Sequence, residues 1–580
     1  MFILFLVIVS LSFGCPHIIM NYLLEKEGKT YTPFVIEPFS HAKWDEVGYA
    51  SKVRQAYDGR YFERGYFRPP ILHVFLFALM TRGLGSIKNV SILGDFIFPP
   101  IIFLLIYCLL VKITQKKLVS VLGGAAVLYG HHLLFSFPPI TVSKLQQTWS
   151  YLVNYGSGKV PLEFSRLESQ FNFVIVTMAI YFFFKSLQTK KIGLGILAGL
   201  LLGTLFYCYF YYWTFFITGC VILLVWSLVK KDWISSKLIL LTIVIGVLLS
   251  IPFWFCAFSF VKNPAYLEFL VRYALEYGRQ PNIPWFYLAF ALIFTVVYGK
   301  RDNTFYFLMS FFFAGIFLLN IHLVTGKTIL KNHWNAMILQ HWVVIMMIVF
   351  LVKIVQYPYQ NFFIRNLAQL LKRIYILFCS LVITFFIFYG YYTNGRFAFK
   401  NYHGYSLSPE LRSAFNWLNQ NTANGSIVMS CSFRTSFLLP VYTHNGAFLS
   451  NGLEAISSNE EILERFLAAY KILGVPRNYV EAFTSRDATK KTGVPKGEAF
   501  GESYMFGFNG NYLSEKKAQE MIHNFSEYNP LIGLRKYPVD YVWVGLYDIE
   551  IKRDEIFKGI PMEAVYRNGS ITIYKIMRPL

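Results

Sequence analysis

Long apolar stretches recur between residues 2 and 392 and limit what this chain can fold into. A helix needs about 20 apolar residues to cross the hydrocarbon core of a membrane. Only 15% of the 580 residues are charged, against about 25% in soluble domains, so we expect much of the chain to lie in lipid. Candidate spans occur at residues 2–21, 92–112, 118–136, 171–186, 192–209, 211–229, 238–258, 284–298, 304–323, 339–356 and 374–392. The predicted fold class is a polytopic α-helical membrane protein with about eleven transmembrane helices.

Basic residues between the spans predict which helix ends face the cytoplasm, because Lys and Arg are enriched in cytoplasmic loops. They occur in every second loop between the spans, at 112–117, 185–191, 230–237, 300–301 and 365–373. These loops, next to anionic headgroups, account for a formal net charge of +22. No basic stretch accompanies a nucleic-acid-binding module. We therefore expect membrane lipid, and not nucleic acid, as a partner.

The opposite, outer face then receives the long loops 22–91, 137–170, 259–283 and 324–338, and everything after about residue 393. The apolar run 71–80 is too short to span and is expected to lie along the outer interface. Arg272, Glu276 and Arg279 are helically spaced and are expected to form surface pairs. For the membrane itself we favour the plasma (inner) membrane of a prokaryote over the endoplasmic reticulum.

The composition becomes mixed after residue 392, which predicts a second domain. Residues 426–433 and 540–546 have the pattern of short buried strands, and 459–473 has helical spacing. Residues 564–574 predict a hairpin around Asn568-Gly569, a pair that favours a type I′ turn. We expect a transmembrane domain at 1–392, with the first outer loop at 22–91, and an extracytoplasmic α/β domain at 393–580.

The first outer loop carries two adjacent carboxylates, Asp45 and Glu46. Such pairs are often solvated helix faces. Here Trp44, Val47 and Tyr49 surround the pair, a setting that can raise the pKa of a carboxyl. A carboxylate held against an apolar surface at the membrane face could remove a proton from an acceptor hydroxyl.

The same loop carries a family resemblance over about 30 residues. Trp44-Asp45-Glu46-Val47-Gly48-Tyr49-Ala50, Tyr61-Phe62 and Arg68-Pro69-Pro70-Ile71-Leu72 resemble the first extracytoplasmic loop of protein O-mannosyltransferases. More broadly they resemble the GT-C superfamily of membrane glycosyltransferases, which includes oligosaccharyltransferase catalytic subunits and lipid A aminoarabinose transferases. That family moves a sugar from a polyprenyl-phosphate or polyprenyl-diphosphate carrier to an acceptor at the outer face.

The resemblance implies roles for particular residues. Asp45 would be the catalytic carboxylate, Glu46 would help to position the acceptor, and Arg68, Pro69 and Pro70 would close the loop. Arg68 stands where protein O-mannosyltransferases have His, and their appended sugar-binding modules have no counterpart here. The acceptor is therefore left open among glycan, lipid and protein.

Two later outer loops hold candidates for the carrier phosphate. Arg166 precedes a span, where it could bind a phosphate or anchor the helix at the interface. Lys327, Lys331 and His333 lie near a Gly break, and could bind the phosphate or form an interfacial belt.

We expect no cofactor and no metal. Oligosaccharyltransferases typically place a metal-binding motif such as Asp-x-Asp in the second outer loop, and none occurs there. Asp45 with Glu163 or Glu168 would make a sparse site for a divalent metal, which needs several oxygen ligands. A metal-dependent mechanism is the less favoured alternative.

The residues and the resemblance leave three functions open. The first is a glycosyltransferase with a polyprenyl-phosphate-linked sugar donor. The second is a transporter or flippase for a lipid-linked sugar, which usually carries ionisable residues at mid-membrane, whereas the spans here are nearly free of charge. The third is a non-catalytic relative that binds glycan.

Overall fold

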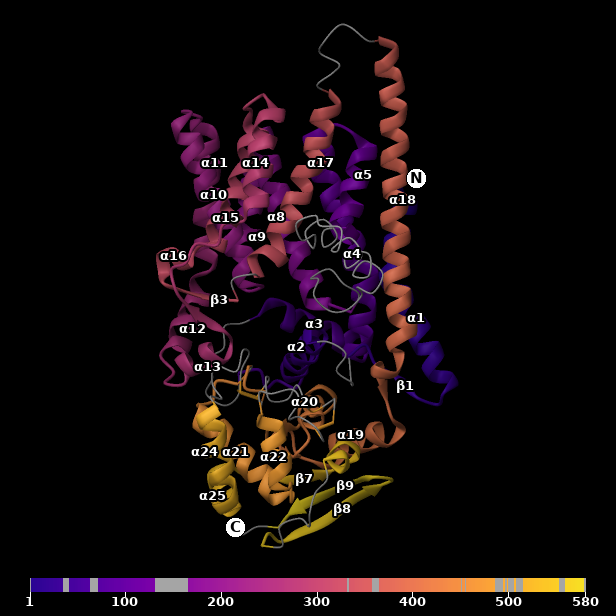
Figure 1. The fold of residues 1–580 in the computed structure, drawn as a ribbon, viewed down its shortest axis with the longest axis vertical. Helices are drawn as coiled ribbons and strands as arrows, with labels where there is room; N and C mark the ends of the chain where they lie inside the picture. Colours follow the sequence, from indigo (N-terminus) through magenta and orange to yellow (C-terminus); the bar gives the residue numbers. More distant parts are fainter. Residues whose placement is uncertain are drawn as a thin grey trace.

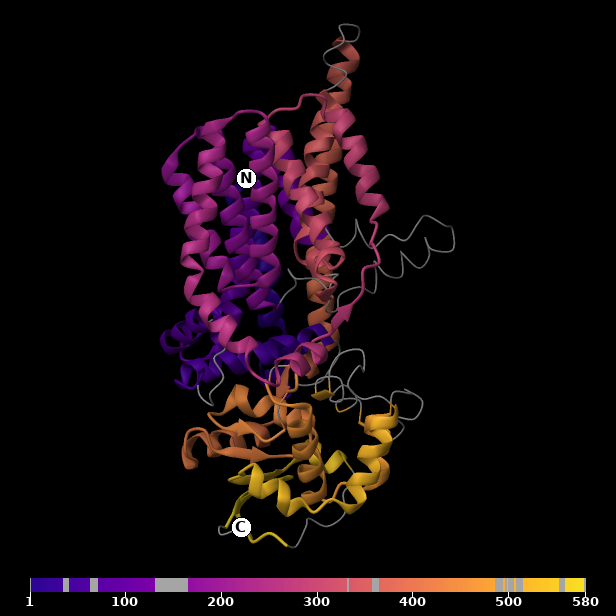
Figure 2. The same ribbon diagram turned by 90° about the vertical axis from the view of Figure 1, so that its left-hand side faces the viewer.

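A computed structural model of the protein describes most of the chain. The described residues are 2–34, 41–62, 71–130, 165–330, 333–356, 365–449, 451–453, 455–485, 494–495, 498, 505–506, 515–551 and 559–577. Helices dominate and form a bundle, with a smaller part that contains the C-terminal strands at one end of it (Figures 1 and 2).

The bundle contains most of the helices up to residue 401. They are α1 (Phe2–Lys26), α2 (His41–Tyr57), α3 (Leu72–Leu84), α4 (Ile87–Thr114), α5 (Lys117–Ala125), η2 (Ala126–Gly130), α8 (Leu167–Thr189), α9 (Ile192–Phe206), α10 (Phe210–Val229), α11 (Trp233–Leu249), α12 (Ile251–Val261), α13 (Tyr266–Arg272), α14 (Trp285–Tyr298), α15 (Asn303–Leu319), α16 (His322–Thr325), η3 (Asn335–Leu339), α17 (Gln340–Gln356) and α18 (Arg365–Asn401). Two short strands, β2 (Leu275–Tyr277) and β3 (Lys327–Ile329), pair antiparallel beside them.

The helices define a multi-pass membrane protein. Among the described residues, seven helices are long and apolar enough to cross a membrane, or eight if the bent pair α11 and α12 is one span. The pair bends by 52° at Ser250, which is followed by Pro252 in the first turn of α12. The other predicted spans fall on the shorter apolar helices α5 with η2, α9 and α14. A polytopic helical membrane protein is thus confirmed, and the count of eleven spans stays a prediction.

Helix α18 joins the bundle to the C-terminal part. Its 37 residues correspond to about 55 Å at 1.5 Å per residue, more than the ~30 Å of a hydrocarbon core. The helix runs along the whole bundle and continues toward the C-terminal part without a break (Figure 1). The strand that follows it, β4 (Ser406–Leu407), pairs with β1 (Thr30–Tyr31), which follows α1.

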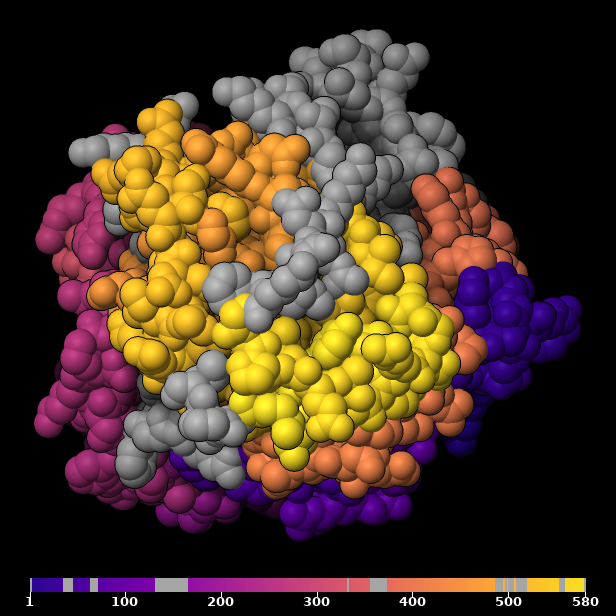
Figure 3. All heavy atoms as spheres, turned by 90° about the horizontal axis from the view of Figure 1, so that it is seen from below, coloured from indigo at the N-terminus to yellow at the C-terminus, as the bar shows by residue number. Residues whose placement is uncertain are grey.

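The C-terminal part contains a five-stranded sheet in the order β6-β5-β7-β9-β8. Strands β5 (Ile427–Met429), β6 (Gly446–Ala447) and β7 (Tyr541–Val544) are parallel, and β8 (Met562–Asn568) and β9 (Ile571–Ile576) add an antiparallel hairpin. The accompanying helices are η5 (Tyr402–Tyr405), α19 (Pro409–Asn421), α20 (Phe433–Tyr442), α21 (Asn459–Ile472), α22 (Arg477–Thr484), α24 (Glu515–Glu527), α25 (Pro530–Lys536) and α26 (Leu546–Glu550). Seen from below, these residues cover most of that end of the bundle (Figure 3).

The local sequence signals of this part are largely confirmed, with one correction. Both buried strands, the helix at 459–472 and the terminal hairpin are present. The turn of the hairpin differs from the expected type I′, because Asn568 is still paired with Ile571. Gly569 and Ser570 are therefore the central residues. Gly569 has φ at 55°, and the φ of Ser570 is not positive, which is the pattern of a type II′ turn, since type I′ needs a positive φ at both positions.

Buried carboxylates hold the connection between β5 and α20. Asp548 accepts hydrogen bonds from the Ser430 hydroxyl at 2.7 Å and from the backbone N–H of Cys431 at 3.0 Å. Glu498 accepts from the Ser432 hydroxyl and the Phe433 N–H, both at 2.7 Å. Burial raises the pKa of both carboxyl groups, and these hydrogen bonds oppose the shift. These hydrogen bonds fix the N-terminal end of α20, and α20 packs against α2.

The expectation that Arg272 forms a surface pair is wrong. Arg272 is fully buried at 0% exposure and donates to the carbonyl oxygens of Gly452 at 2.9 Å, Ala455 at 3.1 Å and Ser457 at 2.8 Å. It also bonds the Asn459 side chain. A planar guanidinium with five donors suits such a set of acceptors. The loop 259–283 is thereby tied to the C-terminal part.

We expect Arg272→Ala to lower the free energy of unfolding by about 3 kcal/mol or more, because several buried carbonyl groups lose a charged donor. Arg272→Lys should restore only part of the lost stability, since a compact ammonium group cannot donate to all of these acceptors at once. Thermal unfolding of detergent-purified protein measures the effect. Arg477→Ala is the control, because that side chain is exposed and pairs within α22. Equal shifts for Arg272→Ala and Arg477→Ala would contradict the proposed tie.

Candidate functional site

The two carboxylates of the first outer loop lie on α2, at the end of the bundle that faces the C-terminal part (Figure 1). Asp45 is half-buried and Glu46 is 6% exposed. Glu46 Oε1 accepts a hydrogen bond from Arg166 Nε at 3.3 Å, and Arg166 is itself 6% exposed. A buried ion pair of this kind requires a fixed geometry, because each charge would be costly alone.

The backbone before α8 positions Arg166. Ser165 has a positive φ of 61°, an uncommon conformation for a residue other than glycine. Its N–H donates to Asp95 Oδ2 at 2.7 Å, and its hydroxyl donates to the Pro33 carbonyl at 2.8 Å. The Gln170 side chain donates to Asp95 Oδ1 at 2.5 Å, and His17 Nε2 lies 2.6 Å from Asp95 Oδ2. Asp95 thus joins α1, α4 and α8 and fixes the turn that presents Arg166.

Sequence reasoning missed this network and treated the spans as nearly free of charge. His17 and Asp95 lie inside the candidate spans Ile3–Lys26 and Ile87–Thr114, and both are buried. Asp95 is a lone acidic residue in an apolar run, and this could have revealed the network, because a buried carboxylate in a membrane helix needs a partner.

A third carboxylate, Glu168, extends the cluster. It is buried, accepts from Asn172 Nδ2 at 2.7 Å, and lies 3.9 Å from His73 Nε2 on α3. Glu46, Arg166, Lys52 and Asp45 are all within electrostatic range of it. Burial lowers the pKa of His73 to about 3, with a further contribution from Lys52, so the imidazole is neutral at pH 7.

Tyrosine side chains enclose this cluster. The ring of Tyr49 lies 6.0 Å from the ring of His73, and the Lys52 ammonium lies 5.1 Å from the Tyr49 ring centre. Burial, and then the charge of Glu168, raise the pKa of Tyr49 far above its usual value, and Tyr209 is affected by the same charge. The charged groups therefore share a poorly hydrated environment, in which electrostatic interactions are stronger than in water.

The late outer loop contributes one residue near this cluster. His333 stacks on Tyr211 with ring centres 5.2 Å apart. Burial lowers the pKa of His333 to about 4, and the charge of Arg166 adds to the shift. His333 is therefore a neutral hydrogen-bonding group near Arg166 at pH 7, and not a second cation.

Of the other candidates, only Lys327 is among the described residues, and it is not part of this cluster. Lys327 lies exposed on β3, opposite Tyr277, and forms no ion pair with any described residue. Lys331, Arg68, Pro69 and Pro70 lie outside the described residues.

The arrangement combines three carboxyl side chains, Asp45, Glu46 and Glu168, with the buried guanidinium of Arg166. Asp45 can act as a proton acceptor, and Arg166 can stabilise negative charge that develops nearby. In the part of the chain that the structure describes, no three His, Cys, Asp or Glu side chains are arranged to hold a metal ion. The expectation that the protein needs no metal stays a prediction from the sequence.

Comparison with known proteins returned no matching family model and no significantly similar curated protein. The fold itself defines the class: a multi-pass helical membrane protein with a buried cluster of acidic and basic side chains at one end of its bundle.

We expect Glu46→Gln to destabilise the protein by about 3 kcal/mol, because Arg166 would lose its carboxylate partner in a buried site. Asp45→Asn should cost less than about 1 kcal/mol, since Asp45 is only half-buried. Thermal unfolding of the two isosteric variants separates a structural carboxylate from a functional one. A larger loss for Asp45→Asn than for Glu46→Gln would reverse these assignments.

Proposed function

We propose that the protein is a GT-C-type glycosyltransferase that moves a sugar from a polyprenyl-phosphate-linked donor to an acceptor at the outer face of the membrane. The observation that carries the proposal is the position of Asp45 beside the buried Glu46–Arg166 pair. Asp45 belongs to the segment that resembles the first outer loop of that superfamily.

In this proposal Asp45 removes the proton of an acceptor hydroxyl, whose oxygen attacks the anomeric carbon of the sugar. The bond from that carbon to the carrier phosphate breaks, and the phosphate leaves with the bonding electrons. Arg166 supplies positive charge for the departing phosphate, and the neutral His333 supplies a hydrogen-bonding group. Glu46 holds Arg166 in place, which adds a structural role to the acceptor-positioning role that the resemblance implies.

The proposed orientation of the protein in the membrane follows from the loops that are rich in Lys and Arg. Helix α8 begins beside Arg166 and ends at Thr189, next to the basic segment 185–191. Helix α10 begins after Tyr209, near Glu168, and ends before Lys230. These loops therefore lie at the end of the bundle opposite α2. By the positive-inside rule that end is cytoplasmic, so we place the site and residues 393–580 outside a prokaryotic plasma membrane.

A lipid-linked sugar transporter is the second candidate, because the His17–Asp95 pair lies inside two candidate spans. Ionisable residues at such positions often mark a transport path. Here Asp95 also bonds Ser165 and Gln170 and so fixes the α8 turn, which favours a structural role. Uptake of a lipid-linked sugar into proteoliposomes without covalent change would favour transport. Binding of that sugar without transfer to any acceptor would favour the non-catalytic glycan-binding alternative.

We expect Asp45→Asn to reduce sugar transfer at least about 100-fold, the usual contribution of a general base. The assay uses radiolabelled lipid-linked sugars extracted from the source membranes, added to protein in membranes of the same lipids. Glu563→Gln is the matched control, because this carboxylate is exposed on β8. Unchanged transfer by folded Asp45→Asn protein would contradict the assignment.

A further inference from the structure

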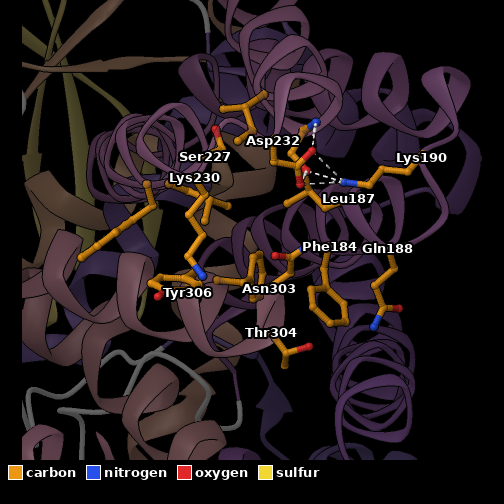
Figure 4. Close-up of a pocket in the computed structure, with 15 residues that line it drawn as sticks. Phe184, Leu187, Gln188, Lys190, Ser227, Lys230, Asp232, Asn303, Thr304 and Tyr306 are labelled. Carbon is orange, nitrogen blue, oxygen red and sulfur yellow. Dashed lines mark hydrogen bonds and ion pairs between the residues drawn. The ribbon is translucent and has the colours of Figure 1, made fainter. Parts of the chain in front are cut away.

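A second candidate binding site lies at the end of the bundle opposite α2. A cavity of about 390 Å³ opens where α8 and α10 end and where α11 and α15 begin. This volume lies within the range of small-molecule sites, about 300–1,000 Å³. Figure 4 shows Asp232 and Lys190 above Leu187 of α8, and Asn303, Thr304 and Tyr306 below it.

The polar side of the cavity is positively charged. Lys190 pairs with Asp232 at 3.0 Å and donates to the Ser235 hydroxyl at 2.5 Å (Figure 4). Lys230 lies 3.9 Å from the ring centre of Tyr306 and donates to the Arg301 carbonyl at 3.3 Å. Among the described residues, no carboxylate lies within ion-pair distance of Lys230. The lining therefore holds two ammonium groups against one carboxylate.

Apolar side chains form the other walls and continue onto the outside of the bundle. Leu223, Trp226 and Phe307 line the cavity. Trp226 is also 38% exposed, and Val229 beyond it is 70% exposed. Trp residues at helix ends are typical of the headgroup level of a membrane. The cavity thus combines an apolar wall that continues onto the exposed surface of the bundle with a cationic rim, at a helix end where we expect lipid headgroups.

We propose that this cavity binds the headgroup of an anionic phospholipid, with the phosphate beside Lys230 and Lys190 and an acyl chain along Trp226. Basic pockets between transmembrane helices recognise anionic headgroups by the same chemistry. Charge complementarity selects an anionic lipid over a zwitterionic one. The inference does not depend on the proposed glycosyltransferase activity.

The test uses protein purified in a non-ionic detergent and titrated with short-chain phosphatidylglycerol, phosphatidylcholine or inorganic phosphate. Native mass spectrometry measures the bound lipid and its Kd. We expect phosphatidylglycerol to bind at least tenfold more tightly than phosphatidylcholine, and inorganic phosphate at equal concentration not to displace it. Equal binding of both lipids, or displacement by free phosphate, would overturn the proposal.

Two variants locate the site. Lys230→Gln should raise the Kd for phosphatidylglycerol about fivefold, the contribution of one basic group near an anionic surface. Lys237→Gln, an exposed position on α11 outside the cavity, should leave it unchanged. Equal effects of these two variants would place the lipid elsewhere.

Asn303→Glu provides a second variant that is expected to fold. Asn303 lines the cavity as the first residue of α15, where an acidic side chain suits the helix dipole. The new carboxylate should repel the headgroup and raise the Kd at least fivefold. Unchanged binding in this variant would also overturn the proposal.

Discussion

A charge buried in an apolar helix bundle must have a partner, and this requirement determines how the site end of the protein is built. Arg166 is placed by Ser165, whose N–H is bonded to Asp95, and Asp95 also contacts His17 and Gln170. Three candidate spans, α1, α4 and α8, meet at this one carboxylate. The Glu46–Arg166 pair then attaches α2 to the same framework. The geometry around Asp45 therefore depends on contacts made deep between the helices.

The C-terminal part holds α2 from the other side. Helix α20 packs against α2, and Tyr442 at its end shares a hydrogen bond of 2.5 Å with Thr32. The β1–β4 pair and the buried Arg272 add two further attachments at different points of the bundle. Helix α2 is thus enclosed between the bundle and the C-terminal part. Such enclosure limits the access of water to Glu46, which is 6% exposed, and limits the ways in which α2 can move.

Much of the helical architecture could be predicted because it is encoded locally. Each apolar run at a predicted span is mostly helical over its described residues, and the strands and hairpin of the C-terminal part lie where the patterns placed them. The predictions were less accurate where a residue's partner is distant in sequence. Arg272 has helical neighbours that suggested surface pairs, whereas its true acceptors lie about 180 residues later. His73 and Glu168 meet only because α3 and α8 pack at the same end of the bundle.

The sequence by itself determined that this is a multi-pass helical membrane protein, because lipid solubility follows from composition and run length alone. It also singled out Asp45 and Glu46 as a polar pair in an aromatic setting. The resemblance implied different roles for the two, and only the tertiary structure showed that Glu46 is buried against Arg166 whereas Asp45 is half-buried. It also showed that His333 is neutral near Arg166, since burial depends on what packs around a side chain. Long-range packing, which no local pattern encodes, therefore decides the chemistry of each group.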